Sequence, residues 1–331
     1  MTRPMGVTLP DDYCYTCHAD VGRERPSHDG MAFDTCASAG CHNYHDNTAL
    51  YEDFLKAHAS DAPLAPQPLV PAHTALALRE RAPAKAMAHL AGDAPPDRRV
   101  NPALMAEWER TTHARAGVNC TACHSAAGLD SGDWIDAPGE RECASCHGTE
   151  AAGFLQGRHG MRLNAGLSRM TPALARRPMK QAALEHELSC TSCHAAHTFE
   201  TRRAAVDACL GCHDDRHSQA YVGSPHHALW VREGEGLAAA GSGVSCATCH
   251  LPREQQRESG ADVVIVQHNQ NLNLRPNEKM ARSVCLTCHG LGFSLGALAD
   301  TRLIASNFSG RPVRSVPGIE MAARRARRGS N

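Results

Sequence analysis

Apolar residues occur along this chain in short runs, and none of them is long enough to cross a bilayer. Residues 263–266 form the clearest run, which predicts a short strand or buried segment. Residues 74–90 are rich in alanine and favour a helix, which Pro83 should break or kink. Residues 62–72 are rich in proline and alanine and predict an extended linker. Because no apolar stretch approaches the ~18 residues of a membrane-spanning helix, we expect no transmembrane segment.

The composition leaves little large side-chain volume for a conventional core. Aromatic residues make up 4% of the 331 residues, with 3 Trp, 5 Tyr and 6 Phe. Something other than side chains must fill the interior, or much of the chain must be loop. The 34 Lys and Arg residues nearly balance the 35 Asp and Glu residues, so nucleic acid is not an expected partner.

All 16 cysteines fall into pairs, and a histidine directly follows the second cysteine of each pair. Seven pairs have the spacing C-x-x-C-H, and one has the longer spacing C-x4-C-H. The seven are Cys14/Cys17/His18, Cys120/Cys123/His124, Cys143/Cys146/His147, Cys190/Cys193/His194, Cys209/Cys212/His213, Cys246/Cys249/His250 and Cys285/Cys288/His289, and the longer one is Cys36/Cys41/His42. This motif is the attachment signature of c-type haem.

The spacing of the motif has a mechanical reason. Two cysteines three positions apart lie on one face of a helical turn, where both can form thioethers with the vinyl groups on one porphyrin edge. The histidine that follows can then reach the iron from the same side, and the two extra residues of the longer motif can bulge outward. Structural zinc, disulfides and thioredoxin-like sites also use paired cysteines, but none of them needs a histidine after every pair. We therefore predict eight covalently attached c-type haems, with the eight motif histidines as proximal iron ligands.

Eight haems would account for the missing core. The chain offers about 41 residues per predicted haem, so the porphyrins themselves supply apolar volume. We predict a mainly α fold with extensive loop, a multihaem c-type cytochrome whose short helices wrap around packed haems. Without haem the chain should be largely unfolded. Arginine side chains are suited to pair with the haem propionates.

Thirteen histidines lie outside the motifs, enough to give every iron a second, distal histidine ligand. Composition therefore does not require an open iron, and it does not exclude one. For each candidate, the alternative is a surface histidine or one that hydrogen-bonds a propionate. The best distal candidates are His28, His58, His113, His159, His197, His226, His227 and His268.

The motif positions divide the chain unevenly. A gap of 84 residues separates the motif starts at Cys36 and Cys120. We predict a two-haem unit at 1–60, a Pro/Ala-rich connector at 61–105, a six-haem unit at 106–300 and a basic tail at 301–331. The tail is either solvated or a docking segment for an acidic redox partner.

Residues 110–295 resemble the hydroxylamine oxidoreductase-like multihaem cytochromes in motif order and in local strings. The similar strings are Thr112-His113 before Cys120, the stretch from Cys190 to His197, the stretch from Cys209 to His226, and Cys246 to His250 followed by His268. The resemblance implies a packed haem array with nearby histidines as distal ligands. It does not cover the N-terminal unit with the longer motif.

The chain departs from that family where the family's catalysis takes place. Residues 184–189 contain no cysteine where the family has the attachment motif of its catalytic haem. The last tyrosine is Tyr221, whereas the family cross-links a later tyrosine to that haem, and no lysine follows any cysteine pair. Residues 214–217 resemble the family's acidic–histidine active-site pair, so Arg216 and His217 are the candidate catalytic residues. The alternative for these residues is a distal ligand or a propionate-bonding cluster.

Two functions follow from an array of eight haems. The first is electron transfer through bis-histidine haems between redox partners, namely a quinol oxidase, other cytochromes or a terminal reductase, with self-assembly into a filament as a variant. The second is a reductase of a small nitrogen or sulfur oxyanion, such as nitrite, hydroxylamine or a tetrathionate-like substrate. It needs one iron without a distal ligand, at the haem of His194 or His213, with Arg216 and His217 supplying positive charge and protons. Haem storage is a third, less specific alternative.

The predicted chemistry also indicates a compartment. Covalent attachment of c-type haem is completed on the far side of the bacterial inner membrane, so we expect a periplasmic or extracellular protein. Residues 1–10 lack the apolar centre of a secretory signal, so we expect the targeting segment to have been removed.

Overall fold

A computed structural model describes residues 57–58, 60–64, 92–125, 133–258, 261–274, 279–313 and 324. The chain divides into two units, Met1–Asp61 with Val316–Asn331, and Ala62–Ser315. The helices and strands below belong to the second unit. Residues 74–90 and most of the predicted linker lie outside the described residues, as does almost all of the predicted two-haem unit, with its motifs Cys14/Cys17/His18 and Cys36/Cys41/His42.

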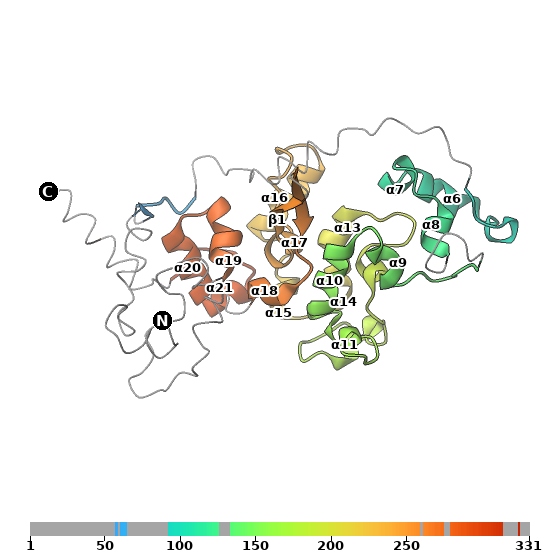
Figure 1. Ribbon diagram of the computed structural model, residues 1–331. Coiled ribbons are helices and arrows are strands. Elements are labelled where there is room, and N and C mark those ends of the chain that lie inside the picture. The colour runs from blue at the N-terminus through green and yellow to red at the C-terminus, as the bar shows by residue number, and fades with distance from the viewer. Residues whose placement is uncertain are drawn as a thin grey trace, which may run out of the picture. The chain divides into compact units, whose positions relative to one another are not determined.

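Short helices make up most of the described structure (Figure 1). In chain order the elements are η3 (Pro96–Arg98), α6 (Pro102–Glu109), α7 (Thr112–Arg115), α8 (Cys120–His124), α9 (Glu140–Ala144), α10 (Gly148–Gln156), α11 (Met161–Asn164), η4 (Pro172–Leu174), η5 (Gln181–Ala183), α12 (Cys190–Cys193), α13 (Thr201–Ala205), α14 (Asp207–Cys212), α15 (Arg216–Gln219), α16 (Pro225–Gly234), α17 (Cys246–His250), β1 (Arg253–Glu258), β2 (Ala261–Val266), α18 (Gln270–Leu274), α19 (Lys279–Ser283), η6 (Cys285–Thr287), α20 (Leu291–Ala299) and α21 (Thr301–Ala305). The mainly α fold with extensive loop is confirmed.

Polar residues begin many of these helices by capping free backbone N–H groups. The side chains of Thr111, Asp215, Ser224 and Ser245 accept hydrogen bonds from N–H groups in the first turns of α7, α15, α16 and α17. Asn119 does the same for Cys120, the first residue of α8. Helices as short as these are unstable alone, so the caps fix where each one starts.

One antiparallel hairpin interrupts the helices. Strands β1 and β2 pair from Arg253 opposite Val266 to Glu258 opposite Ala261. The apolar run at 263–266 lies in β2, so the predicted short strand is confirmed, and Ile265 is buried.

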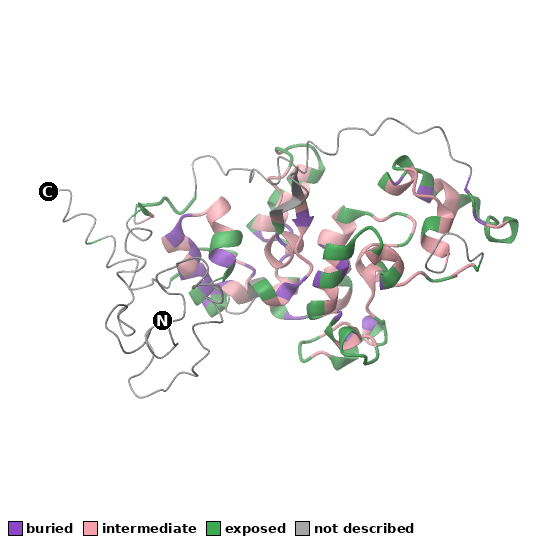
Figure 2. Ribbon diagram, in the orientation of Figure 1, coloured by how far each residue is buried: buried purple, intermediate pink, exposed green. Residues whose placement is uncertain are grey.

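Buried apolar side chains gather at the C-terminal end of the described chain. Met280, Ala281 and Leu298 form a buried cluster, against which Leu295 and Phe308 pack. Figure 2 shows this concentration on α19, α20 and α21, whereas residues of the motif helices α8, α12 and α14 are mostly intermediate or exposed. The packed structure continues past residue 300, where the basic tail was predicted to begin, because Leu303 of α21 is buried.

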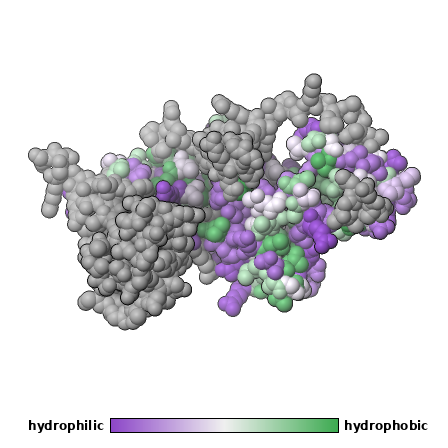
Figure 3. Space-filling view, in the orientation of Figure 1, coloured by the Kyte–Doolittle hydropathy of each residue, from purple (hydrophilic) through white to green (hydrophobic). Residues whose placement is uncertain are grey.

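The surface of the described residues is mixed in character. Figure 3 shows hydrophilic and hydrophobic areas interspersed over short distances on the face drawn. Among the helices that the structure describes, none combines the length and apolarity needed to cross a lipid bilayer.

Candidate haem sites

Six motif histidines each face a second histidine from another part of the chain. The pairs, with the distance between ring centroids, are His113 and His147 (5.9 Å), His124 and His197 (5.9 Å), His159 and His213 (6.4 Å), His194 and His268 (6.3 Å), His217 and His250 (6.1 Å), and His226 and His289 (6.2 Å). These pairs include every attachment motif in the described residues.

The two N-terminal attachment sites fall in the part of the chain that the structure does not describe. The predicted thioether cysteines there are Cys14 and Cys17 in the first motif, and Cys36 and Cys41 in the second. The predicted proximal ligands His18 and His42 lie outside the described residues as well. These two haem sites therefore stay predictions from the sequence motif.

The spacing of the facing rings matches two axial ligands on one iron. A metal–nitrogen bond of about 2 Å on each side, plus about 1 Å from nitrogen to ring centre, places the two centroids about 6 Å apart. Rings in direct stacking contact would lie closer together. The donor set of each site, two cysteine thiols and two imidazoles, is therefore the one that a bis-histidine c-type haem requires.

Hydrogen bonds from ring nitrogens to backbone carbonyls orient several of these rings. The Nδ1 atoms of four histidines lie close to carbonyl oxygens: His124 to Ile135 (2.6 Å), His217 to Ile304 (2.5 Å), His268 to Val266 (2.7 Å) and His289 to Pro63 (3.0 Å). A carbonyl can only accept, so Nδ1 carries the proton and Nε2 keeps its lone pair for iron.

Burial favours the neutral form of several other histidines among the six facing pairs. Burial, with a smaller effect of the facing ring, lowers the pKa of His159 and of His250 to about 4. The same causes lower the pKa of His113, His194 and His226. The neutral imidazole is the form that binds a metal ion, so the sites suit iron at neutral pH.

His197 has an unusual backbone conformation. Its φ is 65°, in the left-handed region that non-glycine residues rarely enter. Its ring lies nearly parallel to that of His124, at 7°, and Trp134 stacks on His124 at 4.5 Å. Backbone strain of this kind is characteristic of functional positions, which agrees with an axial role for His197.

His113 provides a further test of the fit. Its Nδ1 is buried and has no hydrogen-bond partner within the protein. Leaving a buried donor or acceptor without a partner costs about 1–3 kcal/mol. An unpartnered nitrogen such as this is therefore expected where a bound group supplies the missing interaction. The ring lies between His147 and Phe199.

The opposing histidines lie on elements that hold them in place. His113, His217 and His226 lie on the capped helices α7, α15 and α16. His268 follows β2 and packs directly on α10. A Cβ atom at Gly157 would lie 2.8 Å from the carbonyl oxygen of His268, so only glycine permits this approach.

Cysteines of consecutive motifs lie next to one another. The side chains of Cys143 and Cys190 interact, and this interaction lowers the pKa of the Cys143 thiol to about 7. Cys209 and Cys246 interact in the same way, which lowers the pKa of Cys246.

The remaining junctions between described motifs show the same proximity. Burial, followed by the charges of Cys143 and Cys146, raises the pKa of Cys123. The pKa of Cys193 is raised to about 11 by burial and, to a smaller extent, by the charges of Cys209 and Cys212. The pKa of Cys249 is raised to about 12 by burial and, to a smaller extent, by the charges of Cys285 and Cys288. The six attachment sites therefore follow one another in space in their sequence order.

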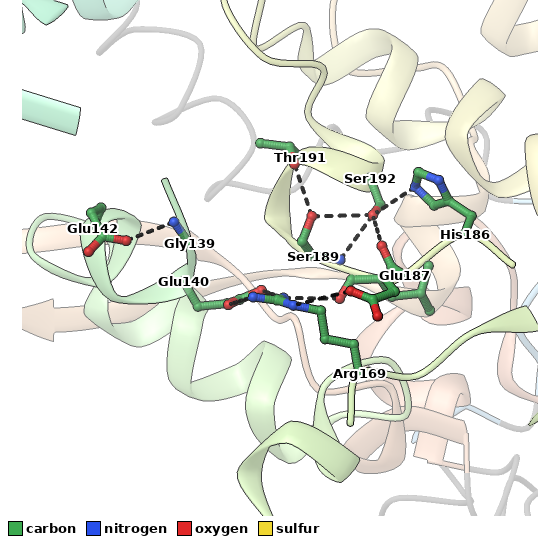
Figure 4. A network of polar contacts seen from close by, with 10 residues as sticks. Gly139, Glu140, Glu142, Arg169, His186, Glu187, Ser189, Thr191 and Ser192 are labelled. Carbon is green, nitrogen blue, oxygen red and sulfur yellow. Dashed lines mark hydrogen bonds and ion pairs between the residues drawn. The ribbon is translucent and has the colours of Figure 1, made fainter. Parts of the chain in front are cut away.

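A polar network connects two of these sites (Figure 4). The guanidinium of Arg169 bonds both carboxylate oxygens of Glu140 at the start of α9, with Nη2 2.8 Å from Oε2, and donates to the carbonyl of Leu188 just before α12. Burial opposes ionisation of Glu140, but the hydrogen bond from Arg169 holds its pKa below the usual value. The network connects the helices that carry Cys143 and Cys190.

The candidate distal ligands have different surroundings. His113, His159, His197, His226 and His268 each lie opposite a motif histidine.

The other three distal candidates have different contacts or lie outside the described residues. His227 lies against Tyr221, and its Nδ1 accepts from the Gly223 N–H at 3.3 Å. The Nδ1 of His58 lies 2.8 Å from an Asp61 oxygen, and His28 is outside the described residues.

The two catalytic candidates, Arg216 and His217, have different surroundings. His217 lies opposite His250, and Arg216 is exposed.

Asp215 has a position that the sequence did not reveal. Its Oδ2 lies 3.7 Å from Nδ1 of His213, and its carboxylate accepts from the hydroxyl and N–H of Ser218. Burial opposes ionisation, but the hydrogen bonds from Ser218 and the charge of Arg177 hold the pKa of Asp215 below its ordinary value. This carboxylate therefore lies beside His213, the histidine opposite His159.

Comparison with known families agrees with this geometry. Residues 112–214, about a third of the chain, match the family model described as cytochrome c3. The matched range contains the motifs that begin at Cys120, Cys143, Cys190 and Cys209. The match supports a multihaem cytochrome with covalently bound c-type haem, and it lends no support to the hydroxylamine oxidoreductase-like family in particular. No curated protein matches the chain.

Proposed function

We propose that this protein is an octahaem c-type cytochrome, periplasmic or extracellular, that carries electrons along a series of bis-histidine haems between redox partners. The observation that carries the proposal is that six histidines stand opposite six motif histidines at 5.9–6.4 Å. An iron with two imidazole ligands has no open coordination position, so it can exchange electrons but cannot bind a substrate.

The chain's own residues hold and tune the cofactor. Haem, when bound, supplies the one-electron chemistry. The motif cysteines would anchor each porphyrin edge, and the carbonyls that accept from Nδ1 fix the ring orientation and tautomer. The burial of His159 and His250 keeps these ligands neutral.

The order of the sites supports a path through the protein. Electrostatic interactions between the cysteines of consecutive motifs link each described site to the next, from Cys120 to Cys288. Electrons would then pass between neighbouring haems in sequence order. The partners would be a quinol oxidase, another cytochrome or a terminal reductase, and a filament of repeated subunits would extend the same path.

The alternative, an oxyanion reductase, finds less support. It requires an iron without a histidine opposite, and its two candidates were the haems of His194 and His213. His268 and His159 lie opposite these two histidines. His217, the proposed proton donor, lies opposite His250.

Spin state tests the proposal for all eight haems at once. The mass of the purified protein should exceed that of the bare chain by eight haems, and the oxidised protein should be entirely low-spin. The reduced protein should not bind CO rapidly. A high-spin signal in the unmodified protein would contradict the proposal and favour the reductase.

Two adjacent histidines give a matched pair of variants. His226→Ala should convert one haem to high-spin and allow it to bind CO, because His226 lies opposite His289. His227→Ala should leave every haem low-spin, because His227 lies against Tyr221. If both variants stayed fully low-spin, or if both became high-spin, the assignment of His226 would be wrong.

A further inference from the structure

One axial histidine has a carboxylate beside it, whereas others are bound to neutral carbonyls. Oδ2 of Asp215 lies 3.7 Å from Nδ1 of His213. In the described residues it is the one carboxylate within 4 Å of a ring nitrogen of the six facing pairs. At 3.7 Å the interaction is electrostatic and too long for a hydrogen bond.

The carboxylate is fixed in place by its neighbours. Ser218 donates its hydroxyl to Oδ2 at 2.8 Å and its N–H to Oδ1 at 3.3 Å, so Asp215 caps α15. The Asp215 side chain is 10% exposed, whereas the nearest cation, Arg177, is 66% exposed and 3.8 Å away. A mostly buried negative charge with a solvated partner keeps much of its field in the interior.

The negative charge of Asp215 also acts on a second site, that of His250. His250, which is deeply buried, also experiences the field of Asp215, together with the opposing field of Arg177. The helix that Asp215 caps carries His217, the histidine opposite His250. Asp215 therefore lies beside His213 and begins the helix that carries the histidine opposite His250.

A negative charge near iron favours the oxidised state, which carries one more positive charge than the reduced state. Carbonyl acceptors, such as that of Ile135 at His124, carry no net charge. Second-shell partners of this kind tune redox centres. We propose that Asp215 is a positioning residue that lowers the reduction potential of the haem held by His213, and to a lesser extent that of the His250 haem. The inference rests on the proposed function, since it takes His213 as an axial ligand.

Asp215→Asn tests the inference, because asparagine can still cap α15 but carries no charge. The reduction potentials are measured in a redox titration followed by the absorbance of each haem population. The potential of one haem should rise by about 59 mV, which is a tenfold change in its oxidised-to-reduced ratio at a given potential. Asp214→Asn removes an exposed charge next to it and should leave every potential unchanged. Arg177→Gln should shift the same haem in the opposite direction and by less, because it removes the opposing cation, whose charge is largely solvated at 66% exposure.

The outcomes separate this inference from the proposed function. Opposite shifts for the Asp215 and Arg177 variants, with low-spin spectra retained, would support the inference. Unchanged potentials with low-spin spectra would overturn the inference about Asp215 and leave the proposed electron-transfer function standing. Loss of the low-spin signal in the Asp215 variant alone would have the same meaning. A high-spin haem in the unmodified protein would instead count against the proposed function.

Discussion

Two regions of the same unit are stabilised in different ways. Among the described residues, residues 112–250 contain five attachment motifs but only five buried apolar side chains, Ala151, Pro172, Ala183, Val206 and Tyr221. Residues 279–305 contain one motif and six buried apolar side chains, Met280, Ala281, Leu291, Ala297, Leu298 and Leu303. We therefore expect the first region to depend on haem to fold, whereas the second has a side-chain core of its own.

The comparison shows how a chain with few aromatic residues can form a defined structure. In residues 112–250 we expect the proposed haems to take the place of a side-chain core, and polar contacts such as that of Arg169 with Glu140 join the helices. In residues 279–305, apolar helices pack against one another beside a single attachment site. Removing a haem or a core side chain should therefore affect the two regions differently.

Loss of one haem should have the largest effect. Cys143→Ser with Cys146→Ser should remove one haem and expose residues 112–250 to proteolysis, because that region has few buried side chains of its own. The matched variant, Cys285→Ser with Cys288→Ser, should also lose one haem but leave residues 279–305 protected. Intact mass gives the haem count, and limited proteolysis with peptide mapping locates the cleavage. Equal protection of the two regions in both variants would show that the regions do not differ.

Truncation of a core side chain should have the second-largest effect on stability. Leu298→Ala should lower the free energy of unfolding by about 3 kcal/mol, the usual cost of truncating a buried leucine, while all eight haems remain attached. Leu174→Ala is the control, because Leu174 is 51% exposed in the haem-rich region. Guanidinium unfolding, followed by the loss of the low-spin spectrum, measures both variants. A similar cost for the two leucines would contradict a side-chain core at α19–α21.

The sequence alone predicts where the haems attach, because the motif chemistry is local. The sequence also offers candidate axial histidines, but it does not determine which of them lie opposite the motif histidines. His226 and His227 differ by about 100° around α16, so only the packing of the helix decides that His226 lies opposite His289. The Nδ1 acceptors are backbone carbonyls, which every residue has, and so leave no signal in the sequence. Asp215 was visible as part of an acidic–histidine string, but its contact with His213 depends on the fold.

The polar contact between α9 and α12 should give the smallest effect, and one that depends on pH. The folded-state pKa of Glu140 lies below its usual 4.5, because hydrogen bonds from Arg169 outweigh burial. A lowered pKa stabilises the fold above the unfolded pKa, and this stability is lost as pH falls through the folded pKa. Glu140→Gln should therefore lower the free energy of unfolding by about 1 kcal/mol at pH 7. The difference from the unmodified protein should shrink as pH falls below 4.5. Glu187→Gln, at an exposed carboxylate 4.0 Å from Arg169, should change little at any pH. A difference for Glu140→Gln that stayed constant down to low pH would show that the charge of Glu140 does not hold the two helices together.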